Sequence, residues 1–214
     1  GFAPATRLRH GGTATMVRQG SPEAVRPVFE AAREVQDFLR GSGSKFCFIG
    51  GVALQRWGQP RFTRDVDLTL LCPLGSEAET IDRMLGEFSA RRPDARTLAL
   101  KNRVILAQTA AGIPIDVALG ALDFEHRCVE RASEFDFGPG LNLLTCSAED
   151  LVILKTFAGR GQDWVDVEYV VVRQRRTLDW RMVERELAPL LELSGAPEKL
   201  DTLRKLRRKI EKGA

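Results

Sequence analysis

Apolar residues change their spacing along this chain near residue 146. Before that point, short apolar segments of strand length alternate with segments in which apolar residues recur at helical spacing. After it, every apolar segment has helical spacing. Strands that alternate with helices are typical of a sheet with helices packed against it. The sequence therefore predicts an α+β (mixed α/β) fold, with a mixed sheet flanked by helices and then a C-terminal helical unit.

Three parts are expected along the chain. Residues 1–20 are polar, rich in Gly, Arg and Thr, and lack apolar periodicity, so we expect a disordered lead-in, part of which would precede a translation start at Met16. Residues 21–146 are the expected α/β domain. Residues 147–214 are the expected helical domain.

Caps and apolar periodicity predict the individual elements. The expected strands are 45–49, 65–71, 103–109, 113–119 and 141–145, of which 103–109 and 113–119 form a hairpin at Ala111-Gly112. The expected helices are 21–41, 52–57, 76–88, 123–132, 148–158, 162–174, 179–193 and 197–212. Ser21 before Pro22 predicts an N-cap, and Ser76 and Ser147 begin capping-box patterns.

Composition excludes several classes of protein. With 43% hydrophobic residues over 214 positions, the chain can bury a sizeable core, which excludes a disordered protein. Its net charge of +3 is too small for a strongly cationic nucleic-acid coat. The basic residues of the last helix could contact RNA phosphates, but the pattern favours a solvated amphipathic helix. No apolar stretch is long enough to span a membrane, and we expect a cytoplasmic protein.

The four cysteines predict neither a metal site nor a disulfide framework. Cys47, Cys72, Cys128 and Cys146 are far apart in the sequence, and no C-x-x-C pair occurs. Three of them lie in apolar segments. Buried, reduced thiols are therefore expected.

Three acids in the predicted strands are the candidate catalytic and metal-binding residues. Asp65 and Asp67 are two apart on one strand, so their side chains leave the same face with roots about 6.6 Å apart. Asp116 is the single charge in an otherwise apolar strand. If the three carboxylates meet, each pair would repel by roughly 3 kcal/mol, a cost that a cation relieves. Oxygen ligands favour Mg²⁺ or Mn²⁺, which commonly serve phosphoryl or nucleotidyl transfer.

Gly50-Gly51 is the candidate phosphate-binding turn. The two glycines follow an apolar strand and precede a short helix, where backbone N–H groups can approach a triphosphate. Arg56, Arg61 and Arg64 lie between this turn and the acids. By itself, Gly50-Gly51 could be an ordinary turn, and Asp65 with Asp67 could be a solvated strand end. The two patterns together favour a nucleotide site.

The combined pattern resembles a known superfamily. Ile49-Gly50-Gly51, then Asp65-Val66-Asp67-Leu68, with Ile115-Asp116-Val117 downstream, is similar to the signature of the nucleotidyltransferases related to DNA polymerase beta. Segments 61–67, 149–155 and 158–166 resemble the AbiEii-type toxin nucleotidyltransferases. The resemblance covers about residues 45–172, and no family motif is evident after residue 175.

This resemblance implies a role for each matching residue. Asp65 and Asp67 would bind the metal ions, and Asp116 would be a third metal ligand or a general base. The implied nucleotide-binding residues are Gly50, Gly51, Arg64, Lys155, Asp163 and Asp166. From the residues alone, Lys155 could instead extend along an apolar helix toward solvent, and Asp163 and Asp166 could pair with Arg160 and Arg173.

The expected activity is metal-dependent transfer of NMP from an NTP to a hydroxyl group, with release of pyrophosphate. From the resemblance, the expected acceptor is RNA, in particular the 3′ end of tRNA, and the protein would be a toxin with a cognate antitoxin as partner. Two alternatives remain open. The acceptor could be a small molecule such as an aminoglycoside, or a protein side chain. The chain could also be a non-catalytic module that binds a nucleotide or a partner.

Overall fold

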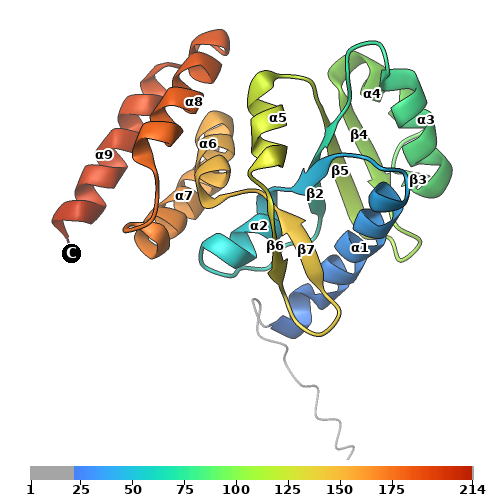
Figure 1. Ribbon diagram of the computed structural model, residues 1–214, viewed down its shortest axis with the longest axis horizontal. Helices are drawn as coiled ribbons and strands as arrows, with labels where there is room; N and C mark the ends of the chain where they lie inside the picture. The colour runs from blue at the N-terminus through green and yellow to red at the C-terminus, as the bar shows by residue number, and fades with distance from the viewer. Residues whose placement is uncertain (1–21, 214) are drawn as a thin grey trace, which may run out of the picture.

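The computed structural model describes residues 22–213, in seven strands and nine helices (Figure 1). The strands are β1 (Phe46–Phe48), β2 (Val66–Leu71), β3 (Ser89–Ala90), β4 (Val104–Gln108), β5 (Pro114–Gly120), β6 (Ser133–Asp136) and β7 (Asn142–Thr145). The helices are α1 (Pro22–Gly41), α2 (Gly50–Trp57), α3 (Glu77–Glu87), α4 (Ala95–Asn102), α5 (Asp123–Glu130), α6 (Ala148–Ala158), α7 (Gly161–Gln174), α8 (Trp180–Leu193) and α9 (Glu198–Lys212). The predicted lead-in and the N-cap predicted at Ser21 lie outside the described residues.

All seven strands form one mixed sheet in the order β3-β4-β5-β2-β1-β7-β6. The predicted hairpin is confirmed, since β4 and β5 pair antiparallel. Strand β2 lies between β5, with which it is parallel, and β1, with which it is antiparallel. The predicted mixed sheet with flanking helices is therefore confirmed.

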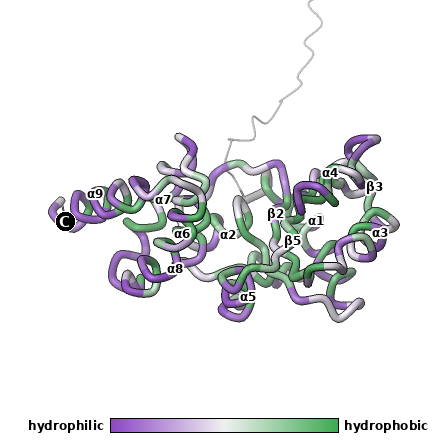
Figure 2. Tube along the Cα trace, turned by 90° about the horizontal axis from the view of Figure 1, so that it is seen from above, coloured by the Kyte–Doolittle hydropathy of each residue, from purple (hydrophilic) through white to green (hydrophobic). Residues whose placement is uncertain are grey.

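Helices cover both faces of the sheet. On one face, α1, α3 and α4 pack against alternate residues of the central strands, among them Val66, Leu68, Ile115 and Val117, which are fully buried. On the other side, α2 and α5 share a second core with α6 to α9, which lie together beside the sheet (Figure 1). Figure 2 shows hydrophobic segments along the central strands and hydrophilic ones toward the end of α9.

All the strands that the structure describes end by Thr145, and only helices follow. The second core nevertheless contains residues from both sides of residue 146, including Cys47 and Leu54 before it and Leu151 and Leu187 after it. The helical unit therefore packs through a core that it shares with the α/β unit. The division into domains at 146 stays a prediction.

Three elements were not predicted, and each lacks the pattern on which prediction depends. Strands β3 and β6 are exposed along their whole lengths, so they carry no apolar alternation. Helix α4 is short and buries only Ala95 and Ala99. Without an apolar face, such elements have no periodicity for the sequence to reveal.

The two predicted capping boxes had different outcomes. Ser147 is confirmed as an N-cap, because its Oγ accepts a hydrogen bond of 3.1 Å from the backbone N–H of Asp150. The cap predicted at Ser76 is wrong, since its side chain accepts no such bond. There, the carboxylate of Glu77 accepts a 2.7 Å bond from the N–H of Gly75, which orders the turn before α3 instead.

The cysteine prediction is confirmed: all four thiols are free and buried. The Sγ atoms of Cys47 and Cys128 are 3.8 Å apart. Among residues 22–213, no helix has the length and apolar character needed to cross a membrane.

Candidate active site

The pairing of β2 with β5 brings the predicted acids together. Asp67 and Asp116 are direct partners across these parallel strands. Asp65 immediately precedes β2, and the two-residue period of a strand places it on the same face as Asp67. Because Val66 and Leu68 turn into the opposite core, the strand cannot shift by one residue without burying its acids there. The sheet register therefore determines that the three carboxylates share one face.

Electrostatic repulsion acts within this group of carboxylates. Burial raises the pKa of Asp67 to about 6, with further contributions from the neighbouring charges of Asp65 and Asp116, while a hydrogen bond from the Gly51 N–H opposes the change. The hydroxyl of Thr63 donates a 3.0 Å hydrogen bond to Asp65 Oδ1 and so holds that carboxylate in place. The protein therefore holds negative charge together where water stabilises it poorly.

The glycine turn packs directly against these acids. Helix α2 begins at Gly50, two residues earlier than predicted, so both glycines belong to its first turn. A Cβ atom on Gly50 would lie 2.1 Å from Asp67 Oδ2, and one on Gly51 would lie 2.2 Å from Thr63 Oγ1. Gly50 also has φ of +55°, in the left-handed region. Only glycine allows the helix N-terminus to come this close to the carboxylates.

We expect Gly50→Ala to lower stability by more than about 1 kcal/mol, because it adds the cost of a left-handed alanine to the clash with Asp67. Chemical denaturation of the variant and of the wild type measures the difference. Gly86→Ala in α3 is the matched control, since its Cβ would meet no atom within 4 Å and alanine favours a helix. Equal stability of Gly50→Ala and wild type would contradict the close approach.

A cavity of about 480 Å³ lies over the three carboxylates, a size typical of small-molecule sites. Its lining residues are Gly51, Arg61, Phe62, Thr63, Arg64, Asp65, Asp67, Asp116, Lys155, Arg160, Gln162 and Asp163. Most of the predicted site residues line it; Gly50 adjoins it through its contact with Asp67, and Asp166 lies behind it. Cationic side chains thus face the acids across one cavity.

Lys155, Asp163 and Asp166 form a buried ion cluster at the wall of this cavity. Lys155 Nζ lies 3.0 Å from Asp163 Oδ1 and 2.8 Å from Asp166 Oδ2. Arg61 donates two 2.9 Å hydrogen bonds to Asp166, and Arg160 Nε donates one of 2.7 Å to Asp163. Burial would raise the pKa of both acids, but these hydrogen bonds hold it below the usual value.

The contacts of this cluster bear out only part of the ion-pair interpretation of Asp163 and Asp166. Asp163 pairs with Arg160, as the ion-pair interpretation expected. Arg173 instead donates a 2.6 Å hydrogen bond to the carbonyl of Gly58 and forms no ion pair with Asp166. Arg61 pairs with Asp166 across 105 positions of sequence, a contact that no local pattern could reveal.

Arg91 is the site residue that sequence reasoning missed. It follows the short strand β3, and its guanidinium donates a hydrogen bond to Asp116 Oδ1. Burial raises the pKa of Asp116, and the charge of Arg91 opposes that change. Since β3 is exposed and only two residues long, no apolar pattern marks the segment that delivers this arginine.

The chemistry of the carboxylates fits a divalent cation. Asp65 and Asp67 supply only oxygen ligands, and their mutual repulsion is what a cation relieves. As they stand, with Arg91 engaging Asp116, no three His, Cys, Asp or Glu side chains within residues 22–213 are arranged to hold a metal ion. Metal binding by Asp65, Asp67 and Asp116 therefore stays a prediction.

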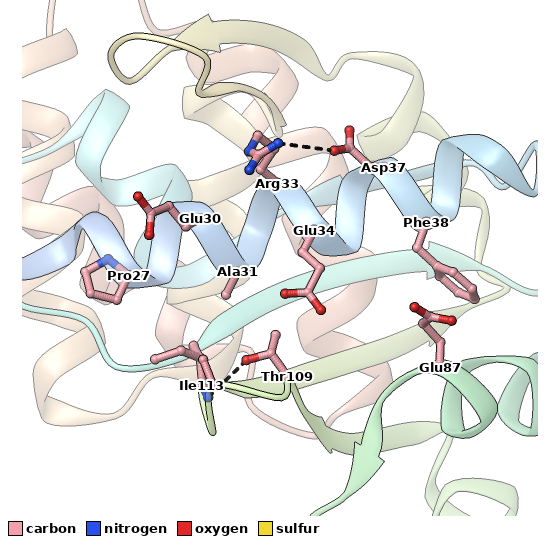
Figure 3. Close-up of a pocket in the computed structure, with 11 residues that line it drawn as sticks. Pro27, Glu30, Ala31, Arg33, Glu34, Asp37, Phe38, Glu87, Thr109 and Ile113 are labelled. Atoms are coloured by element: carbon pink, nitrogen blue, oxygen red, sulfur yellow. Dashed lines mark hydrogen bonds and ion pairs between the residues drawn. The ribbon is translucent and has the colours of Figure 1, made fainter.

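Another cavity, of about 600 Å³, lies away from the carboxylates, between α1 and the loop that joins β4 to β5 (Figure 3). The acids of its wall are Glu30, Glu34, Asp37 and Glu87, and its one cationic side chain, Arg33, faces Asp37. None of the predicted site residues lines it. A polyanionic nucleotide would be repelled there, so charge favours the cavity over Asp65 and Asp67.

Comparison with known proteins identifies the family of the chain. A family model described as "Nucleotidyl transferase AbiEii toxin, Type IV TA system" matches residues 37–210. An antigenic nucleotidyltransferase-like protein from Paracoccidioides brasiliensis is similar at 15% identity and a TM-score of 0.41, covering 87% of this chain and 94% of that chain. The antibiotic-resistance factor ANT(2'')-Ia is similar at 17% identity and a TM-score of 0.43, covering 88% and 95%. No curated protein matches the chain. On the family match, this chain belongs to the AbiEii nucleotidyl transferase toxins.

Proposed function

We propose that this nucleotidyltransferase transfers NMP from an NTP to a hydroxyl group at the 3′ end of RNA, tRNA in particular, and that the reaction depends on Mg²⁺ or Mn²⁺. The observation that carries the proposal is the register of β2 and β5, which sets Asp67 beside Asp116 under a cavity rimmed by cations. Family membership supports a toxic outcome of the transfer and a cognate antitoxin as partner.

The side chains of this site divide the work of the reaction. The acceptor oxygen attacks the α-phosphorus, a new P–O bond forms, and the bond to the bridging oxygen breaks so that pyrophosphate leaves. Asp116 accepts the proton of the attacking hydroxyl, and Arg91 beside it favours the charged form that can do so. Asp65 and Asp67 would hold the metal ion, which when bound supplies positive charge to the triphosphate and the leaving group.

The triphosphate is held by the turn and the cationic rim. Gly50 and Gly51 bring the N-terminus of α2 to the carboxylates, where backbone N–H groups can bind phosphate oxygens. Arg64 and Arg160 are exposed at the rim, where each can meet a phosphate from solvent, Arg160 through the part of its guanidinium that Asp163 does not engage. Lys155 is committed to Asp163 and Asp166, so its role is to complete the wall of the cavity and add positive charge behind it.

We expect wild-type protein, given α-labelled NTP, Mg²⁺ and total tRNA, to place label on RNA. Addition of EDTA should abolish labelling, and excess Mg²⁺ or Mn²⁺ should restore it, because the repelling carboxylates cannot position the triphosphate without a cation. Gel separation of RNA and protein after the reaction measures the product. Label on protein alone would contradict the acceptor, and full labelling in EDTA would contradict metal dependence.

A further inference from the structure

A smaller, mostly apolar cavity of about 360 Å³ adjoins the cavity over the carboxylates. Its lining residues are Pro27, Val28, Phe62, Thr63, Arg64, Gly112, Ile113 and Pro114. Phe62, Thr63 and Arg64 line both cavities. Asp65 follows these residues directly in the chain, and Asp116 lies two positions beyond Pro114 on β5. The smaller cavity therefore opens beside the carboxylates, because the segments that line it continue along the chain to Asp65 and Asp116.

Phe62 is an aromatic residue that lies outside both hydrophobic cores. Its side chain is 37% exposed, and it belongs to neither hydrophobic core. The guanidinium carbon of Arg64 lies 5.5 Å from the centre of the ring. Arg64 is itself exposed and forms no ion pair with any residue in the range 22–213. An exposed aromatic ring with an arginine beside it is a combination on which an unpaired base stacks.

We propose that this cavity is the acceptor subsite, and that it takes the terminal base of a single-stranded RNA end. The base stacks on Phe62 and enters the apolar cavity beside Pro114, while Arg64, which borders both cavities, keeps its contact with the triphosphate of the NTP. This inference rests on the proposed function, because it names where the acceptor of that reaction binds. Because Phe62 borders both cavities, a base held on its ring would leave the ribose at the cavity over the carboxylates.

The charge and shape of the subsite favour a nucleic acid over a cationic small molecule. A polycationic acceptor would be repelled by Arg64, and nothing in an aminocyclitol stacks on an aromatic ring as a base does. Apart from Thr63, whose hydroxyl donates its hydrogen bond to Asp65, the rest of the lining is apolar, and Val28, Ile113 and Pro114 offer no polar side-chain partner to a sugar. The planar face of a base matches this lining, because every base presents a π-face irrespective of its sequence.

The test compares two RNA acceptors on the full-length protein. One is a tRNA transcript, and the other is the same transcript with an abasic 3′-terminal residue. We expect wild type to show a KM for the abasic RNA about 5- to 150-fold higher, the range found for loss of one stacked base. Phe62→Ala should raise the KM for the normal RNA by a similar factor and discriminate little between the two, with a smaller effect on the KM for NTP, because Phe62 borders that cavity as well.

Two further variants separate stacking from structure. Phe62→Tyr keeps an aromatic face and should retain the KM of wild type. If the ring served only folding, Phe62→Ala would lower the Tm in thermal unfolding. Phe157→Ala removes an equally exposed phenylalanine, at 40%, on α6 and should behave as wild type. Equal KM values of wild type for the two RNAs would overturn the subsite.

The same experiment keeps the subsite distinct from the proposed function. If wild type labels no RNA at all, the RNA acceptor itself is wrong. If wild type labels both RNAs with one KM, transfer to RNA stands and only the subsite is wrong. Equal KM values of Phe62→Ala and wild type for the normal RNA would likewise remove Phe62 from acceptor binding.

Discussion

Asp67→Asn should lower nucleotidyl transfer by at least about 100-fold while leaving the protein as stable as wild type or more stable. Asparagine keeps the size of the side chain and removes its charge. Stability should hold or increase because Asp67 is buried beside Asp65 and Asp116, and its charge is unfavourable there in the absence of a ligand. Initial rates with α-labelled NTP and tRNA, together with thermal unfolding, measure the two quantities.

The opposite signs of these two effects make the prediction specific. A residue that merely supports the fold would lose activity and stability together, whereas a charge held for function costs stability until its ligand binds. Asp82→Asn is the matched control, since Asp82 is an exposed aspartate that pairs with Arg96 far from the cavity. Full activity of Asp67→Asn would exclude this carboxylate from the reaction.

Lys155→Met should destabilise the protein by about 3 kcal/mol or more at neutral pH, which corresponds to a fall in Tm of roughly 6 to 12 °C. The side chain of Lys155 is 11% exposed and forms ion pairs with Asp163 and Asp166, whose side chains are 3% and 1% exposed. Without it, Arg61 still pairs with Asp166 and Arg160 with Asp163, but the repulsion between the two acids is no longer balanced. Thermal and denaturant unfolding measure the loss.

Two comparisons show whether the buried charge is the cause. Lys209→Met breaks an exposed pair with Glu168, and its cost should stay within about 1 kcal/mol. Adding Asp163→Asn and Asp166→Asn to Lys155→Met should recover part of the lost stability, because neutral amides need no cation. A Tm of Lys155→Met within 2 °C of wild type, on the order of the cost of a surface pair, would show that the cluster contributes little to the fold.

The strongly periodic elements were predictable because each buries an apolar face. Strands β2 and β5 and helices α6 to α9 match their predicted ranges within two residues. The exposed strands β3 and β6 bury no side chain, so their sequences show no apolar alternation that would predict a strand. The cap at Ser147 formed, whereas Ser76 accepts no such bond and the carboxylate of Glu77 orders the turn before α3 by accepting from the N–H of Gly75.

The candidate site was predictable where its residues belong to those periodic strands. Asp65, Asp67 and Asp116 are charges within otherwise apolar segments, which is a local signal. The glycine turn is equally local, although only the structure shows that a Cβ at Gly50 would strike Asp67. Arg91 was not predictable, because it is 25 positions from Asp116 in the chain and reaches it only once the intervening segment has folded.

By itself, the sequence determined the α+β fold class, the strands that carry the acids, and the identity of the three carboxylates, because each depends on residues close together in the chain. Tertiary structure alone decided which residues meet: Arg91 pairs with Asp116, Arg61 pairs with Asp166, and Phe62 and Pro114 line one cavity. These contacts join segments that lie up to 105 positions apart. Their energies depend on burial and distance, which exist only once the sheet and its helices have packed.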